Sequence, residues 1–87
     1  MVIDLQTLYP NPAVEVVNLE FNTDTEGAMS IQIFNVAGQL QLDIPVNTNK
    51  GENRFSLDIS TIASGTYYVK MVGSTVNEQP LQFVKVK

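Results

Sequence analysis

The chain contains no cysteine and no histidine among its 87 residues. Without cysteine it has no disulfide bond and no thiolate zinc site. The absence of cysteine is compatible with both reducing and oxidising compartments. Without histidine it lacks the commonest general base and metal ligand of proteins, so no Ser-His-Asp or Cys-His arrangement can form. We therefore expect no enzymatic activity, no bound metal and no cofactor.

Basic residues are scarce as well, with 5 Lys and Arg against 9 Asp and Glu, a net charge of −4 and a pI near 4.4. Nucleic-acid binding needs a basic footprint, so it is not expected. No apolar run approaches the roughly 20 residues that cross a bilayer, so membrane insertion is not expected either. Residues 1–4 lack the basic and apolar regions of a secretory signal, and any export signal is expected on a longer parent chain.

Helical periodicity is also missing, and short segments of alternating apolar and polar residues take its place. Turn signals separate these segments, with glycines at positions 27, 38, 51, 65 and 73. Such spacing is typical of a sandwich or barrel of short strands. The connections are too short for parallel crossovers. The sequence therefore predicts a single all-β domain, a seven-stranded antiparallel immunoglobulin-like β-sandwich.

The predicted strands cover residues 2–8, 14–21, 29–34, 39–44, 55–59, 65–72 and 81–87. Leu40, Leu42 and Ile44 are expected to face the core together, and Pro45 ends that strand or marks it as an edge. Residues 46–53 are expected to form an exposed loop, and residues 73–80 a polar connection. The adjacent apolar residues Phe83 and Val84 break the alternation of the last strand, so its register stays open.

The clearest strand is residues 65–72, in which Tyr67, Val69 and Met71 alternate with outward side chains. The spacing from Ile62 to Tyr67 fits a tyrosine corner, in which the phenol hydroxyl bonds to the preceding backbone. The outward row combines an aromatic ring, a cation and an aliphatic side chain. This row is either ordinary sandwich surface or a docking face. The candidate docking residues are Tyr68, Lys70 and Val72.

The final strand carries Lys85 and Lys87 on either side of Val86. One interpretation is a charged edge that resists edge-to-edge aggregation. The other is an exposed strand offered for pairing with a receptor. An edge-strand dimer is a further open alternative. The residues alone favour the charged edge over receptor pairing.

The ordered motifs of the chain resemble the C-terminal sorting domain (type A) of the type IX, or Por, secretion system of Bacteroidetes. They are YPNPA at residues 9–13, IFNVAGQL at 33–40, IASGTY at 62–67 and FVKVK at 83–87. Two departures are Asn35, where the family usually has aspartate, and a less basic approach to the last strand. The resemblance assigns motif positions to Tyr9, Pro10, Asn11, Pro12, Gly38, Gly65, Tyr67, Lys85, Val86 and Lys87.

The resemblance implies a non-catalytic sorting signal recognised in the periplasm by the secretion machinery at the outer membrane. It implies that the parent protein then reaches the cell surface or is secreted. A sortase-like cysteine peptidase would remove the domain by a cut upstream of Tyr9. On this basis residues 9–87 are the sorting domain, and residues 1–8 are a linker, a first strand or a remnant of cloning.

The alternative from a different class is a fibronectin-like accessory module of an extracellular hydrolase, acting as a spacer or weak carbohydrate binder. The three tyrosines would have to supply its sugar platform, because the chain has no tryptophan. A sorting domain is expected to be the last segment of its parent chain, whereas an accessory module need not be.

Overall fold

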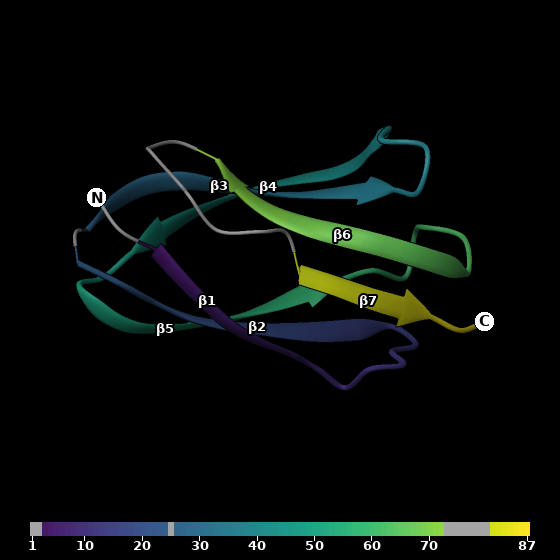
Figure 1. The fold of residues 1–87 in the computed structure, drawn as a ribbon, viewed down its shortest axis with the longest axis horizontal. Helices are drawn as coiled ribbons and strands as arrows, with labels where there is room; N and C mark the ends of the chain where they lie inside the picture. The colour runs from purple at the N-terminus through teal and green to yellow at the C-terminus, as the bar shows by residue number, and fades with distance from the viewer. Residues whose placement is uncertain (1–2, 25, 73–80) are drawn as a thin grey trace.

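The computed structural model describes residues 3–24, 26–72 and 81–87. The described residues form seven strands (Figure 1): β1 (Ile3–Tyr9), β2 (Val16–Thr23), β3 (Gly27–Asn35), β4 (Leu40–Thr48), β5 (Gly51–Asp58), β6 (Gly65–Val72) and β7 (Leu81–Lys85). All strand pairings are antiparallel. The predicted all-β fold is therefore confirmed. The connection predicted over residues 73–80 lies outside the described residues.

The strands form two sheets, one of three strands in the order β1-β2-β5 and one of four in the order β4-β3-β6-β7. Figure 1 shows that the β1–β2 connection, the β3–β4 turn, the β5–β6 connection and the C-terminus gather at one end of the sandwich. This end therefore brings together all four sequence motifs that carry the family resemblance, although they are far apart in the chain.

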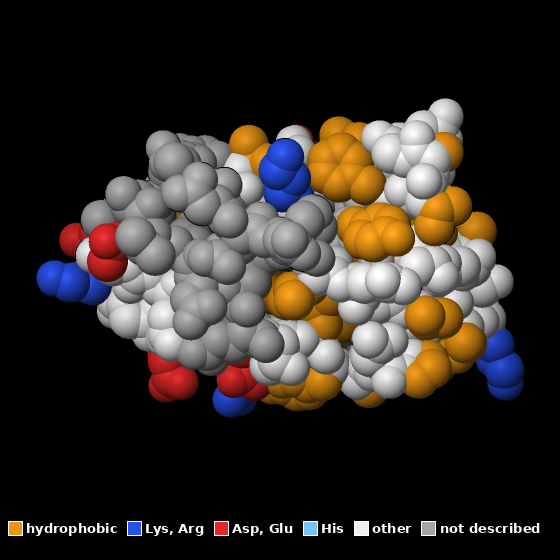
Figure 2. Space-filling view, viewed as in Figure 1, with side chains coloured by type: hydrophobic (Ala, Val, Ile, Leu, Met, Phe, Trp, Pro, Cys, Tyr) orange, Lys and Arg blue, Asp and Glu red, His pale blue; other side chains and the backbone are white. Residues whose placement is uncertain are grey.

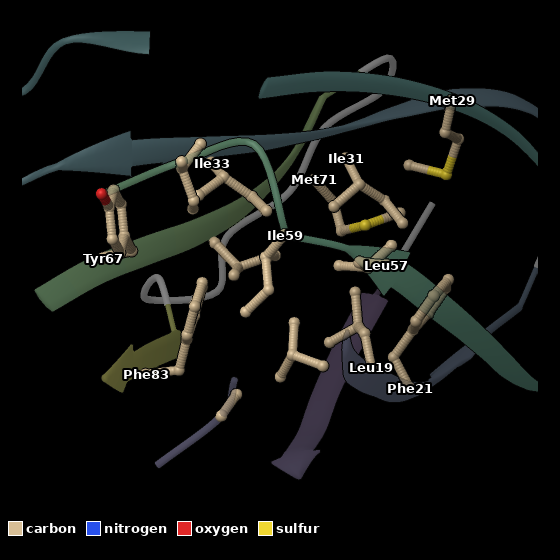
Figure 3. Packing of buried hydrophobic residues seen from close by; sticks show 14 residues of the cluster. Leu19, Phe21, Met29, Ile31, Ile33, Leu57, Ile59, Tyr67, Met71 and Phe83 are labelled. Atoms are coloured by element: carbon tan, nitrogen blue, oxygen red, sulfur yellow. The ribbon is translucent and has the colours of Figure 1, made fainter. Parts of the chain in front are cut away.

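The core lies between the sheets and is built from alternate residues of each strand, as period-2 patterning requires. The three-stranded sheet contributes mainly from β2 and β5, and the four-stranded sheet from β3, β6 and β7 (Figure 3). The largest fully buried side chains are Phe21, Phe83, Leu19, Ile31, Ile33, Leu57, Ile59, Met71, Val17 and Val69. Each such burial contributes about 1.5–3 kcal/mol of hydrophobic stabilisation.

The register of the last strand, left open by the sequence, is fixed by its pairing with β6. Tyr67 lies opposite Phe83, and their rings stack with centroids 5.6 Å apart. Phe83 is fully buried and Leu81 packs against the core, whereas Val86 faces outward. The aromatic stack selects the Leu81 and Phe83 set because cross-strand partners share one face of a sheet.

The prediction that Leu40 faces the core is wrong. Leu40 is 48% exposed and does not face the core, because a register shift lies between the pairs Ile33–Leu42 and Phe34–Leu40. That shift is a β-bulge, which turns the residues on one side of it to the opposite face. Leu42 and Ile44 do pack against the core. Pro45 lies within β4, which pairs with β3 alone among the described strands, so its assignment to an edge is confirmed.

The predicted loop over residues 46–53 is instead the continuation of β4, a tight connection and the start of β5. The buried side chain of Asn53 closes the connection. Its Oδ1 accepts a hydrogen bond from the Asn49 amide at 2.9 Å, and its Nδ2 donates to the Asn49 and Gly51 carbonyls at 2.8 and 3.1 Å. The polar residues of this stretch therefore form the connection by which the chain passes from the four-stranded sheet to the three-stranded sheet.

The tyrosine corner is present as predicted. The hydroxyl of Tyr67 donates a short hydrogen bond to the Ala63 carbonyl, and its ring is buried. Ile62, also buried, donates its backbone N–H to the Ile59 carbonyl. These contacts tie the β5–β6 connection to the start of β6 and thus hold the two sheets together at this end.

Replacing Tyr67 by phenylalanine keeps the ring stack with Phe83 and removes only the corner hydrogen bond. We expect Tyr67→Phe to lower the free energy of unfolding by about 1 kcal/mol, the usual net contribution of one hydrogen bond. Denaturant unfolding measures this change. Tyr68→Phe, one residue along on the outer face, is the matched control and should leave stability unchanged. Equal effects of the two variants would contradict the structural role of the corner.

Candidate recognition surface

The outer face of the four-stranded sheet carries a transverse row of large side chains. In the β3–β4, β3–β6 and β6–β7 pairings, Leu40 lies opposite Phe34, Phe34 opposite Tyr68, and Tyr68 opposite Gln82. Phe34 and Tyr68 are half-buried and Leu40 is exposed. Figure 2 shows hydrophobic side chains gathered over the start of β6 and the β3–β4 turn. Tyr68 therefore lies in a wider apolar row, which we call the aromatic row (Leu40, Phe34 and Tyr68).

A polar row follows the aromatic row along the sheet. Gln32 pairs with Asp43 of β4 on one side and with Lys70 of β6 on the other. Lys70 and Asp43 are exposed. The predicted docking residue Lys70 therefore lies on β6 beside an uncharged amide, and its side chain is exposed.

Val72, the third predicted docking residue, belongs to a shallow hollow at the far end of the same face. The hollow has a volume of about 270 Å³ and is lined by Ala28, Met29, Ser30, Pro45 and Val72. Ser30 pairs with both Pro45 and Val72, so the hollow spans three strands. Tyr68, Lys70 and Val72 thus lie on one face, as predicted, each in a different transverse row.

Phe34 and Leu40, which complete the aromatic row, were not predicted as surface residues from the sequence. The signal for Phe34 was its place one residue after Ile33, because alternation puts neighbours on opposite faces. Leu40 carried no such signal, because only the bulge next to it turns its side chain outward.

The β3–β4 turn that holds this row is organised by Asn35. Its Oδ1 accepts hydrogen bonds from the backbone amides of Ala37 and Gln39, both at 3.0 Å. Its Nδ2 donates to the Gln39 Oε1 at 3.0 Å. Gly38 has φ of +80°, a conformation that disfavours any residue with a Cβ. Gly38, a motif position, is therefore required by the turn.

The YPNP segment lies against the last strand and is joined to it by hydrogen bonds. Asn11 uses its side chain, since its Oδ1 accepts from the Val84 amide at 3.0 Å and its Nδ2 donates to the Gln82 carbonyl at 3.3 Å. Ala13 continues the contact through its backbone, bonding to Val84 and Val86 at 2.8 Å. The first and last motifs of the chain are thus one structural unit.

Tyr9 lies at the end of β1, partly exposed on the outer face of the three-stranded sheet. A hydrogen bond to the Glu20 side chain raises the pKa of the Tyr9 phenol above its ordinary value, while the nearby Arg54 charge opposes the shift. Arg54 Nε is 3.5 Å from the Glu20 carboxylate. A hollow of about 210 Å³ lies beside Glu20 and Arg54 on this sheet.

The expectation that Lys85 forms part of a charged exposed edge is wrong. Lys85 is only 4% exposed, because it follows Phe83 onto the inner face of β7. It lies opposite Gly65, which has no side chain to compete for the space. Its Nζ donates to the Lys87 carbonyl at 2.8 Å, while Lys87 itself is exposed. Lys85 therefore buries its aliphatic stem and holds the end of the chain in place.

Potential metal-ligating side chains are dispersed in the part of the chain that the structure describes. There, no group of three or more potential metal-ligating side chains occurs. No helix there is long and apolar enough to cross a membrane. Hydrogen bonds from Ser60 lower the pKa of the exposed Asp58 carboxyl, which accepts a hydrogen bond from the Ser60 amide in the turn after β5. The notable surface features are therefore the aromatic row, the hollow beside Val72 and the edge of β7.

This architecture places the chain in the class of immunoglobulin-like β-sandwich domains. More specifically, the family model described as "Secretion system C-terminal sorting domain" matches residues 7–84. The chain therefore belongs to this family, the sorting domains of the type IX secretion system. The family acts in general without catalysis, as a C-terminal sorting signal, and this implies export of the parent protein to the cell surface or into the medium.

A solved structure supports the fold. The crystal structure of dimeric latent PorU from Porphyromonas gingivalis is similar to this chain with a TM-score of 0.77 and 18% sequence identity. The similarity covers 97% of this chain and 9% of the PorU chain. At this identity the similarity shows the fold alone. No curated protein matches the chain significantly in sequence.

The contribution of the Asn35 side chain to the β3–β4 turn can be measured by substitution. We expect Asn35→Ala to lower the free energy of unfolding by about 1–2 kcal/mol, because two backbone amides lose their acceptor. Asn35→Asp keeps that acceptor and should stay within about 0.5 kcal/mol of the native protein. Thermal or denaturant unfolding measures both. If aspartate proved as damaging as alanine, the bond to Gln39 would be the one that holds the turn.

Proposed function

We propose that this domain is recognised as a folded unit in the periplasm and directs its parent protein through the outer membrane by the type IX secretion system. The single observation that carries the proposal is the family match, which spans residues 7–84 of the chain. The described surface offers no metal cluster. Recognition must therefore use surface shape, side chains and strand edges.

The contact surface in this proposal is the outer face of the four-stranded sheet. Aromatic side chains are enriched in the cores of protein interfaces, and charged side chains at the rim confer specificity. The aromatic row supplies the first and Lys70 the second. The opposite sheet presents polar groups already bonded to one another, such as the Ser56 hydroxyl, which donates to the Asn18 Oδ1 at 2.6 Å.

Most motif positions have a different role in this proposal, which is to keep the recognised shape. Gly38 forms a turn, Tyr67 a corner, Asn11 a bridge to β7, and Lys85 a buried anchor for the chain end. Substitutions at these positions would act through stability. Substitutions on the aromatic row and at Lys70 would act through binding.

Secretion of a fused periplasmic reporter in a bacterium that has the system tests this proposal. We expect the double variant Leu40→Ser with Lys70→Glu to leave most of the reporter in the periplasm, because it removes an apolar contact and reverses a charge on the proposed face. Deleting residues 81–87 should have the same effect through loss of β7. Fractionation and immunoblotting measure the distribution.

The matched control is Val16→Ser with Lys50→Glu, which makes the same chemical changes away from the proposed face. Val16 is 44% exposed on the three-stranded sheet, and Lys50 is exposed between β4 and β5. Both double variants must first unfold at the same denaturant concentration as the native domain. Equal secretion of the two double variants would reject the face, and undiminished secretion after the deletion would reject the function.

The second part of the proposal is removal of the domain by a sortase-like cysteine peptidase. Proteases bind their substrates as extended chains, and β1 is already paired with β2 from Ile3 to Tyr9. A cut within this stretch would require β1 to leave its sheet. We therefore place the cleaved bond upstream of Tyr9 and, more narrowly, before Ile3.

Mass spectrometry of the secreted parent protein tests this cleavage. The mature protein should lack the whole sandwich and end at a residue before β1. The same parent in a strain without the peptidase is the control and should retain the domain. Recovery of peptides from β2 to β7 on the mature secreted protein would show that the signal is retained.

A further inference from the structure

The outer edge of β7 lies outside the contact face proposed above. In an antiparallel strand, successive residues direct their backbone groups alternately to one neighbour and to the other side. Phe83 and Lys85 lie in register with Tyr67 and Gly65 of β6. The backbone groups that bond away from β6 belong to Gln82, Val84 and Val86. Such a row of outward groups is a template for another strand.

Residues 11–13, which we call the clasp, cover this template. The Val84 amide and the Gln82 carbonyl bond to the Asn11 side chain. The Val84 carbonyl accepts from the Ala13 amide, and the Val86 amide donates to the Ala13 carbonyl. Ala13 and Lys85 form an isolated parallel bridge, so the clasp is not a full strand. Four outward backbone groups of residues 82–86 are therefore satisfied by the Asn11 side chain and the Ala13 backbone.

The chemistry of the clasp makes it replaceable. The primary amide of Asn11 offers one acceptor and one donor where a neighbouring strand would offer a carbonyl and an N–H. A strand can therefore take over these bonds one for one. Pro10 and Pro12 have no N–H and cannot lengthen the pairing. Asn11 and Pro12 are exposed, whereas Ala13 is fully buried in the core. Ala13 contributes only a methyl group to that core, so displacing the clasp uncovers little apolar surface.

We propose that the outer edge of β7 is a strand-addition site, closed by the clasp and opened when an extended segment of a partner protein displaces it. The partner segment would pair with Gln82, Val84 and Val86 in place of Asn11 and Ala13. Val84 is half-buried and Val86 exposed, and they present apolar side chains along the site. The occupant is thus an extended peptide with apolar residues at alternate positions, because main-chain bonds give affinity and flanking side chains give selectivity.

Amide hydrogen exchange of the purified domain, followed by NMR, tests the clasp. Asn11→Ala removes the acceptor of the Val84 amide, and we expect that amide to exchange at least about tenfold faster. The Val86 amide should change less, because the Ala13 carbonyl remains. The amides of Phe83 and Lys85 should keep their protection. The matched control is Asn47→Ala, an exposed asparagine of β4, which should leave all four amides unchanged.

The second step uses a synthetic peptide with the sequence of residues 81–87 as the extended strand. It should bind the Asn11→Ala domain about tenfold more tightly than the native domain, because the native site is mostly closed. Binding should restore protection to the Val84 amide. Fluorescence anisotropy gives the affinities and NMR gives the location.

Three results would overturn the inference. The Val84 amide could exchange equally fast in the native and Asn11→Ala domains, which would mean that no clasp protects it. The peptide could protect amides of β4 or leave Val84 unprotected, which would place strand addition elsewhere or exclude it. Self-association of Asn11→Ala through Val84, without peptide, would assign the edge to a second copy of this chain. None of these readouts involves secretion, so they are independent of the secretion test.

Discussion

The stacked pair of Tyr67 and Phe83 fixes the rest of the structure at the end where the motifs meet. Because side chains alternate along a strand, a shift of one residue would move every side chain of β7 to the opposite face. The stack and the bond from the Tyr67 hydroxyl to Ala63 exclude that shift. With Phe83 inward, Lys85 must also point inward. The backbone groups of Val84 must then point away from β6, toward the segment that contains Asn11.

This constraint separates two kinds of residue that a motif alone does not distinguish. Tyr67, Gly38 and Asn11 lie within the motifs and determine turns, corners and edges. Tyr68 and Lys70 lie on the outer face, where substitution costs little stability and where a partner has access. A sorting domain has to keep one shape whichever protein it is attached to. The residues that determine its shape are therefore the ones we expect sorting domains to share, whereas the residues that contact the partner depend on that partner.

The sequence was sufficient for the fold class and for β6, because Tyr67, Val69 and Met71 alternate without interruption. It was insufficient wherever two apolar neighbours compete for the core, as at Phe83 and Val84, since only the partner strand decides between them. Leu40 was misassigned because a bulge changes the face after it without a compositional signal. Lys85 was misassigned because an empty space opposite Gly65 accepts its stem, and such a space appears only when strands are paired.

The two edges of the four-stranded sheet are protected by different physical means, and the difference bears on function. The β4 edge contains Pro45, whose missing N–H is a permanent feature of the covalent chain. The β7 edge is instead protected by hydrogen bonds from Asn11 and Ala13, which form and break without any covalent change. Both devices suppress unwanted association between sheets. Only the second can be reversed, so if one of these two edges is to receive a partner, the geometry selects the edge of β7.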